Sequence, residues 1–502
     1  MKKILAVMLA VLMLASLFAG CASEKPAETT GNTAETTAPA ASDETTAPET
    51  TDEIVELTMV AVGNGMPANY DAWKAHIDAY LEEKIGVHLN VEVIGWGDWD
   101  QRRTMMVSTN EPYDIMFTNG NTYYNDVNMG AFADISSLIE TAAPELHKFI
   151  PADYWDACRI NGGLFAVPTY KDSSMSQYFV HDQALVEEVY PDYASAHTME
   201  AVTPILKAMY EKTGTAPLVL HKEGLNPSLI PLKYDDMSTG LAAIGVSYDG
   251  DPKAPKVVVT LEQEDVKNDL TILSDWYKAG YINSDAAILG ESPKYKATGV
   301  AQGWPAAAKT NWGPNRGVEC IAIQWADTVV SNATVQGSLN CISAACKHPE
   351  KALQLLELIN LDPIVRDAMF YGLEGDNFDY VEVNGEKRVH KNNTDWTMAG
   401  YTQGTFFTVT TLDTDEFNQW DEVKALNEQA KASPILGFCF NTEPVNDELA
   451  ACVAIWKEYQ STLTTGTDVE CVPALLEAMR ASGLDAIIAE AQSQIDTWVA
   501  SK

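Results

Sequence analysis

The chain has 502 residues, 46% of them hydrophobic, and its formal charge is −38. A field of that sign repels nucleic acids and polyanionic ligands, although salt screens it beyond about 10 Å. The composition therefore favours a neutral or cationic small ligand.

The N-terminus joins two lysines to an apolar run over 4–18 that ends at Ala19-Gly20-Cys21. This pattern predicts a secretory signal peptide over 1–20, because the run is shorter than the roughly 20 apolar residues that cross a bilayer. Residues 17–21 resemble the lipobox of bacterial lipoproteins, with the usual leucine shifted by one position. The resemblance implies that Cys21 receives a diacylglycerol thioether and attaches the protein to the lipid bilayer. An ordinary signal peptide with an incidental cysteine is the alternative.

Residues 21–53 comprise Cys21 and a stretch made mostly of Thr, Ala, Glu, Ser and Pro. Such a stretch has no large apolar side chain to offset the entropy of ordering, so it is expected to be a disordered tether. The remaining residues, 54–502, are long enough for two or three domains.

Strands and helices alternate at the start of this region. The expected elements are, in order, a strand, a helix, a strand, a helix and a strand over 57–62, 73–85, 87–93, 98–108 and 113–117. Their order predicts a parallel sheet with right-handed crossovers. Because ligands bind beyond the carboxyl ends of such strands, the loops at 63–66 and 118–124 are marked as candidate binding loops.

The alternation continues further along the chain. Strands are expected over 257–260 and 320–325, with a helix over 264–279 between them. Two more helices with apolar faces are expected over 347–360 and 484–498, and each should pack against a core.

Cysteines, histidines and short motifs give no sign of a metal site or of catalytic chemistry. Seven cysteines follow Cys21, an odd number without CxxC spacing, so buried thiols are expected instead of a disulfide framework. The scattered histidines argue against zinc. Neither a GxSxG nor a Walker A motif occurs, and no cofactor is expected.

Several segments together resemble one protein family. They are YDIMFT (113–118), GAFADI (130–135), INGGLFAVP (160–168, with Gly163 in place of a usual lysine), HPEKA (348–352), YGLEG (371–375) and GLD (483–485). In order and spacing they are similar to family 1 extracellular solute-binding lipoproteins of ABC importers, of the large oligosaccharide type with a distinctive C-terminal domain.

The resemblance implies an α/β fold, a two-lobe periplasmic-binding-protein-like clamp of type II that closes on its ligand. Each lobe would be a mainly parallel sheet flanked by helices, with extra C-terminal helices. Lobe 1 is expected over 54–168 plus 335–375, and lobe 2 over 169–334 plus 376–502. Residues 167–170 would form a hinge.

A sugar presents an apolar face, which suits an aromatic ring, and a rim of hydroxyls, which suits amides, carboxylates and lysine. Candidates are aromatic residues beside Gly, Asn or Pro in predicted loops, with their polar neighbours; core packing or solvent exposure is the alternative for each. The candidate substrate-binding residues are Trp304, Trp312, Trp96, Trp99, Asn64, Asn119, Tyr123, Tyr124, Tyr170, Lys171, Asp172, Tyr371, Glu374, Trp396 and Gln403. Trp304 and Trp312, two tryptophans in a turn-rich stretch, are the foremost stacking candidates.

Clustered carboxylates have two interpretations. Asp98 with Asp100, Asp235 with Asp236, and 413–416 could supply the two carboxyl groups, about 5–10 Å apart, that glycoside hydrolysis needs. Since the chain has 71 acidic residues, chance proximity is common and solvated surface is the preferred interpretation.

The hypothesis from sequence is a lipid-anchored substrate-binding protein that captures an oligosaccharide between its lobes and delivers it to ABC permease subunits. It would be a monomer without enzymatic activity, on the extracellular face of the cytoplasmic membrane of a Gram-positive bacterium. The alternatives are a secreted carbohydrate-active enzyme and a surface ligand sensor with the same clamp.

Overall fold

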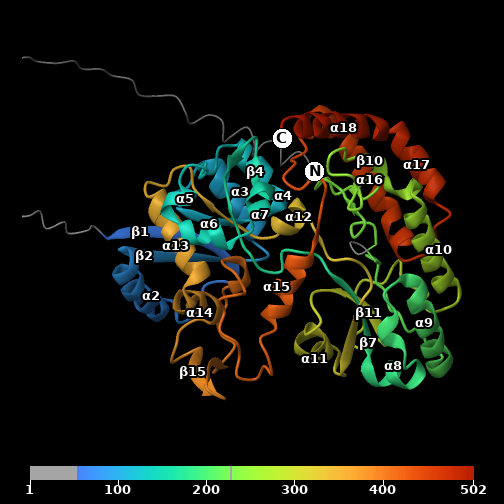
Figure 1. Cartoon of the computed structure of the whole chain (residues 1–502), viewed down its shortest axis with the longest axis horizontal. Coiled ribbons are helices and arrows are strands. Elements are labelled where there is room, and N and C mark those ends of the chain that lie inside the picture. Colours follow the sequence, from blue (N-terminus) through green and yellow to red (C-terminus); the bar gives the residue numbers. More distant parts are fainter. Residues whose placement is uncertain (1–53, 226–228) are drawn as a thin grey trace, which may run out of the picture. The chain divides into compact units, whose positions relative to one another are not determined.

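Two separate hydrophobic cores organise the computed structural model, which describes residues 54–225 and 229–502 (Figure 1). The first core collects buried side chains from 57–170 and 330–369 and the side chain of Met398. The second collects them from 175–329 and 435–495. We call the parts around them the first and the second lobe. The expected signal peptide, Cys21 and the whole of the expected tether up to residue 53 lie outside the described residues.

The first lobe is built around a mixed five-stranded sheet in the order β2-β1-β3-β14-β6. Its strands are β1 (Val55–Gly63), β2 (Val87–Gly95), β3 (Ile115–Thr118), β6 (Val167–Pro168) and β14 (Leu339–Ile342). Its helices include α2 (Tyr70–Ile85), α3 (Trp99–Thr109), α4 (Gly120–Asn128), α5 (Ile139–Ala142), α6 (Pro144–Phe149), α7 (Ala152–Ala157), α12 (Asn332–Val335), α13 (Pro349–Leu361) and α14 (Pro363–Tyr371). Two hairpins complete it: β4 (Arg159–Ile160) with β5 (Gly163–Leu164), and β15 (Phe378–Val383) with β16 (Glu386–Lys391).

The opening of this lobe confirms the predicted β-α-β-α-β order. β1 pairs in parallel with both β2 and β3, and it is almost entirely buried because helices cover both faces of the sheet. Helix α2 ends at Gly86, whose left-handed φ of 65° lets its amide donate to the carbonyl of Glu82 at 3.0 Å. Strand β14 then adds antiparallel to β3 and β6.

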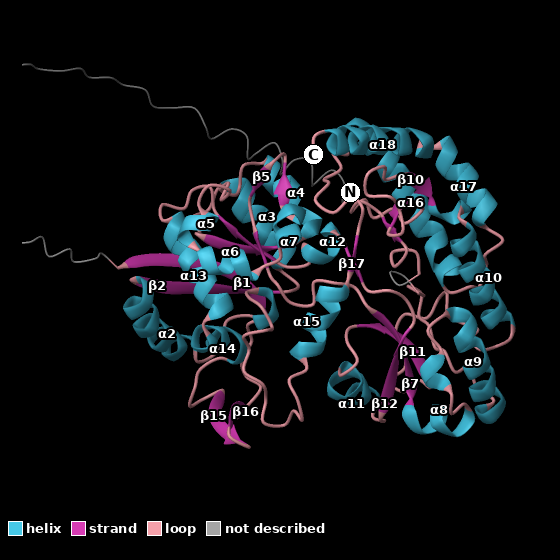
Figure 2. Cartoon of the chain, in the orientation of Figure 1, coloured by secondary structure: helices cyan, strands magenta, loops and turns pink. Residues whose placement is uncertain are grey.

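The second lobe has two three-stranded sheets backed by long helices (Figure 2). Its strands are β7 (Gln177–Asp182), β8 (Tyr234–Asp235), β9 (Ile244–Ser247), β10 (Val257–Val259), β11 (Thr298–Gln302) and β12 (Cys320–Gln324). Its helices include α8 (Gln183–Val189), α9 (Met199–Thr213), α10 (Glu264–Lys278), α11 (Gly313–Arg316), α16 (Asn446–Thr464), α17 (Val472–Ala481) and α18 (Leu484–Ala500).

The expectation of a mainly parallel sheet is wrong for the second lobe. β7 pairs antiparallel with β11 and β12, and β9 pairs antiparallel with β8 and β10. β8, β9 and β10 follow one another without an intervening helix, and such short connections give antiparallel pairing. The predicted helices over 264–279 and 484–498 are confirmed as α10 and α18.

The chain crosses between the lobes three times. The first two crossings lie between Tyr170 and Met175 and at β13 (Val329–Val330), near the expected positions. The third differs from the expected boundary after residue 375. Residues 376–398 stay with the first lobe, where Gly63 and Met398 form a β-bridge, and the chain returns through α15 (Trp420–Gln429) and β17 (Lys431–Ala432).

Two further findings concern residues 54–225 and 229–502. All seven cysteines after Cys21 are free thiols, and four of them are buried, as predicted. No helix within these ranges is long and apolar enough to cross a membrane.

His181 gives the second lobe a specific pH dependence. It is fully buried on β7, where its Nδ1 lies 2.9 Å from the hydroxyl of Thr298, and burial lowers its pKa from 6.5 to about 3. Between these two values the unfolded state binds more protons than the folded state, so the free energy of unfolding falls as pH decreases. His181 alone would contribute a slope of up to about 1.4 kcal/mol per pH unit.

We predict that His181→Gln flattens the loss of stability between about pH 6 and pH 4. The free energy of unfolding of the wild type and the variant is measured by urea unfolding at a series of pH values, with a signal that reports on the second lobe. Parallel stability curves for the two proteins over this range would contradict the prediction.

Candidate binding site

The carboxyl ends of β1 and β2 meet a distant segment of the first lobe. The amide of Trp96, just after β2, donates to the carbonyl of Gly63 at 3.2 Å. The amide of Asn64 donates to the carbonyl of Thr397 at 2.8 Å. These bonds bring residues 396–402 to the sheet edge where ligands of parallel sheets bind.

Two exposed aromatic rings lie side by side at this edge. Trp96 and Tyr401 are each 44% exposed, and their centroids are 6.4 Å apart with the planes 13° from parallel. The ring of Trp96 also meets the edge of Phe117 at 6.1 Å. Exposed rings held in one orientation offer flat apolar faces to a ligand. We call Trp96 and Tyr401 the aromatic pair.

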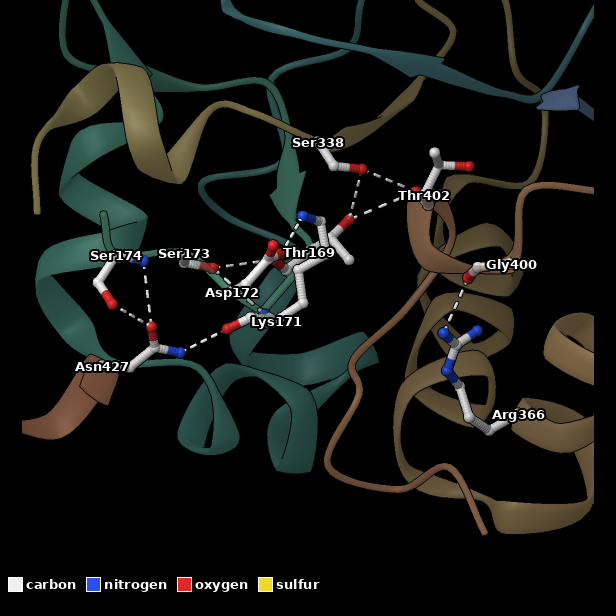
Figure 3. Close-up of polar contacts among 10 residues, drawn as sticks. All are labelled: Thr169, Lys171, Asp172, Ser173, Ser174, Ser338, Arg366, Gly400, Thr402 and Asn427. Carbon is white, nitrogen blue, oxygen red and sulfur yellow. Dashed lines mark hydrogen bonds and ion pairs between the residues drawn. The ribbon is translucent and has the colours of Figure 1, made fainter. Parts of the chain in front are cut away.

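Buried hydrogen bonds fix the loop that carries Tyr401. The carbonyl of Thr402 accepts from the hydroxyl of Ser338 at 3.0 Å (Figure 3). It also accepts from the side-chain amide of Asn340 at 3.1 Å. On the other side, the guanidinium of Arg366 donates to the carbonyl of Gly400 at 2.8 Å and to that of Thr405 at 2.6 Å. Tyr401 is therefore presented from a loop whose backbone is held at several points.

The first crossing segment lies beside this loop. The ammonium of Lys171 pairs with the carboxylate of Asp172 and lies 5.8 Å above the ring of Phe406. The side-chain oxygen of Asn427 on α15 accepts from the amide of Ser174 at 3.1 Å, and its NH₂ group donates to the carbonyl of Lys171 (Figure 3). The segment is thus held by the helix that begins the third crossing.

A cavity of about 350 Å³ opens between the two lobes at this point. It is lined by the first crossing, by β8 and its following turn, and by α12. The lining residues are Lys171, Asp172, Met175, Pro231, Tyr234, Asp235, Asp236, Tyr248, Gln302, Ser331, Ala333, Thr334 and Gly337. The loop that carries Tyr401 meets the first crossing just before Lys171, because the carbonyl of Thr402 accepts from the hydroxyl of Thr169 at 3.4 Å. Burial, with a smaller contribution from the charge of Asp172, raises the pKa of Tyr401. We call it the interlobe cavity.

Asp235 and Asp236 differ from the surface interpretation of the sequence. Asp235 is only 6% exposed and Asp236 is half-buried. Burial raises the pKa of both carboxyl groups, to about 6 for Asp236, where the charge of Asp235 adds to the effect. The amides of Met237 and Ser238 donate to them at 2.9 and 3.0 Å and favour the ionised forms.

The two foremost tryptophan candidates have different surroundings. Trp304 follows Gln302 of the cavity, is partly exposed, and lies 5.5 Å from Trp420, while its indole nitrogen donates to Gln419 at 3.1 Å. Trp312 ends a π-helical turn over Ala308–Trp312 and packs on Tyr178 at 5.9 Å. Neither tryptophan lines the interlobe cavity, although both lie near Gln302: Trp304 is two residues after it, and the ring of Trp312 packs against Gly303.

Five candidates from sequence are buried, so they pack in the first lobe and present no surface to a ligand. Tyr123 donates its hydroxyl to the carbonyl of Cys158 at 2.6 Å, and Tyr371 donates to that of Thr410 at 2.7 Å. The five are Trp99, Tyr123, Tyr170, Tyr371 and Gln403, all at most 6% exposed. Tyr124, the next residue on the same helix as Tyr123, is only partly buried.

The remaining candidates lie around the site or outside it. Asn119 caps α4, accepting from the amide of Asn121 at 3.1 Å. Tyr124 reaches the other lobe, donating to the side chain of Asn441 at 3.3 Å. Trp396 packs on Trp73. The structure places exposed residues Asn64 beside β1 and Glu374 beside the β15–β16 hairpin.

Sequence reasoning omitted Tyr401 from the leading candidates and assigned the Asp235–Asp236 pair to the surface. Tyr401 follows Gly400, the same glycine-aromatic signal that marked Trp96 after Gly95. Tyr234, Tyr248 and Phe406 carry no comparable local signal. Within residues 54–225 and 229–502, no group of three His, Cys, Asp or Glu side chains is placed to hold a metal ion.

Comparison with known proteins finds two family models that match parts of the chain. Residues 64–311 match the family model described as bacterial extracellular solute-binding protein, and residues 434–500 match a domain of unknown function, DUF3502. A carbohydrate ABC transporter substrate-binding protein of Streptococcus pneumoniae is 27% identical over 464 residues, 89% of this chain and 91% of that protein.

Solved structures show the same likeness. The N-glycan transport solute binding protein of Streptococcus pneumoniae is 26% identical, with a TM-score of 0.78 over 89% of this chain and 99% of that one. Its complex with Man1GlcNAc is likewise 26% identical, with a TM-score of 0.68 over 88% and 99% of the two chains. The likeness confirms the two-lobe fold expected from sequence.

We predict that Arg366→Met loosens the loop that carries Tyr401. The fully buried guanidinium is replaced by a side chain without donors, so the carbonyls of Gly400 and Thr405 lose their partners, at about 1–3 kcal/mol each. Hydrogen exchange of the amides in 401–405 should become faster, and the free energy of unfolding should fall.

Arg480→Met is the matched control, since Arg480 is exposed and its pair with Glu262 lies at the surface. It should leave exchange in 401–405 unchanged. Equal exchange in the Arg366 variant and the wild type would show that Arg366 does not hold the loop.

Proposed function

We propose that this chain, which belongs to the bacterial extracellular solute-binding proteins and carries a C-terminal DUF3502 domain, captures an oligosaccharide between its lobes for an ABC importer. The observation that carries the proposal is the exposed aromatic pair beside a polar cavity that both lobes line. A sugar needs this combination, because its C–H face stacks on rings while its hydroxyls bond to polar groups.

The surroundings of the cavity support a glycan of several units. A second set of rings, the partly exposed Trp420 and Trp304, lies beyond the buried ring of Phe406, and their centroids are 5.5 Å apart. Two separated sets of rings offer more than one stacking position. The named relatives of similar length add support, since one of them is described in complex with Man1GlcNAc.

Binding between two lobes also supports delivery to a transporter. The cavity is lined from both lobes, so a bound ligand would bridge them and favour a closed arrangement by its contacts with each. The closed form would then be the one that ABC permease subunits recognise. The relatives are named as substrate-binding proteins, which fits capture without chemical turnover.

The expected N-terminal anchor completes the proposal. A diacylglycerol on Cys21 would supply two acyl chains, enough for stable attachment where a single chain binds marginally. The Thr-rich and Glu-rich stretch up to residue 53 would act as a tether. A monomer held in this way on the extracellular face of a Gram-positive cytoplasmic membrane would stay within reach of its permease.

Titration calorimetry against a panel of neutral mannose-, glucose- and N-acetylglucosamine-containing oligosaccharides tests the proposal. We expect at least one to bind, and Trp96→Ala to weaken it by about tenfold or more, because a lost stacking face is worth roughly 1.4 kcal/mol.

Tyr295→Ala is the matched control, as Tyr295 is a similarly exposed ring on the second lobe, 50% accessible and bonded to Asp182. It should bind like the wild type. If no oligosaccharide of the panel binds while peptides or other metabolites do, carbohydrate capture is the wrong function.

A further inference from the structure

The walls of the interlobe cavity carry an unbalanced negative charge. Of its lining residues, Lys171 is the one with a cationic side chain, whereas Asp172, Asp235 and Asp236 carry carboxyl groups. The ammonium of Lys171 is already paired with Asp172. One lysine against three aspartates leaves two carboxylates, Asp235 and Asp236, without a cation in the cavity wall.

The backbone positions these two carboxylates firmly. Asp235 ends β8, which pairs with β9, and the turn after it passes through left-handed φ values of 59° and 58° at Met237 and Ser238. The amides of these two residues donate to Asp235 and Asp236. The amide donors favour the charged carboxylates and so oppose the rise in pKa that burial gives both groups; with a pKa of about 6, Asp236 is mostly ionised at neutral pH.

The other polar groups of the cavity are uncharged. Tyr234, Tyr248 and Gln302 supply hydroxyl and amide groups, and Ser331 and Thr334 line the opposite wall. The hydroxyl of Tyr234 already donates to Asp265 at 3.0 Å. A ligand in this cavity therefore meets carboxylates that accept hydrogen bonds, but no cation other than the paired Lys171.

We propose that Asp235 and Asp236 restrict the cavity to uncharged or amine-bearing glycans and exclude sugars that carry a carboxylate. This inference rests on the proposed function and names the ligand class of the same site. Sugar hydroxyls and ammonium groups donate to carboxylates, which offsets the desolvation of both partners. A uronic or sialic acid would bring another negative charge beside these carboxyl groups, in a site of low effective dielectric where like charges repel strongly.

The test compares each neutral gluco- and manno-oligosaccharide of the panel with two derivatives. In one, the terminal C6 alcohol is oxidised to a carboxylate; in the other, that carboxylate is converted to its uncharged primary amide. With the wild-type chain at neutral pH, we expect the carboxylate form to bind at least about tenfold more weakly than the neutral sugar. The amide should recover most of the lost affinity, because it has nearly the same shape without the charge.

Variants assign the effect to the two residues. Asp235→Asn with Asp236→Asn should reduce the preference for the neutral form to about threefold or less, whereas the exposed Asp275→Asn on α10 should leave it unchanged. If the double variant does not fold, the amide derivative on the wild-type chain still decides the question.

The outcomes separate the two hypotheses. If neutral and carboxylate forms bind the wild type equally, exclusion is wrong and the proposed function stands. If the amide binds as weakly as the carboxylate, size and not charge sets the preference, and exclusion is also wrong. If no neutral sugar binds, the proposed function itself fails.

Discussion

The carbonyl of Thr402 is the point on which the arrangement of the site depends. It accepts hydrogen bonds from Ser338 and Asn340, while Arg366 donates to the carbonyls of Gly400 and Thr405 on either side. Figure 3 shows the bonds from Ser338 to Thr402 and from Arg366 to Gly400. These groups are buried, so water cannot replace the bonds that they would lose if the loop moved. The loop consequently has little freedom, and Tyr401 projects from it in one orientation.

This constraint connects the two cores to a single binding surface. The aromatic pair belongs to the first lobe, and the carboxylates of Asp235 and Asp236 belong to the second. Between them lies the first crossing, whose Lys171 and Asp172 line the cavity and are held in place by Asn427. A rigid aromatic face, a crossing segment and an acidic wall thus come from three parts of the chain that lie far apart in sequence. Apolar and polar recognition are divided between the lobes, so a ligand that uses both must hold them together.

The sequence predicts the first lobe well because its signals are local. Apolar runs and helical spacing locate β1, α2, β2, α3 and β3, and Gly86 ends α2 as expected. Whether the strands of the second lobe run parallel or antiparallel depends on which strands pair, and local sequence does not reveal the pairing. There the expected parallel sheet is wrong. The third crossing was misplaced for the same reason: residues 376–398 join the first lobe through contacts with strands more than three hundred positions earlier.

The candidate site divides in the same way into residues with a local sequence signal and residues without one. Trp96 and Lys171 were identifiable because they follow a predicted strand and the expected hinge, whereas Asp235 looks like any other acidic residue in the sequence and only the folded chain buries it in the cavity wall. The most direct test of binding between the lobes is a crystal structure of the protein with the tightest neutral oligosaccharide of the panel. It should show a sugar ring against Trp96 and Tyr401 and sugar hydroxyls within hydrogen-bond distance of Asp172 or Asp235. A glycan bound elsewhere, with the interlobe cavity holding none of it, would contradict this assignment.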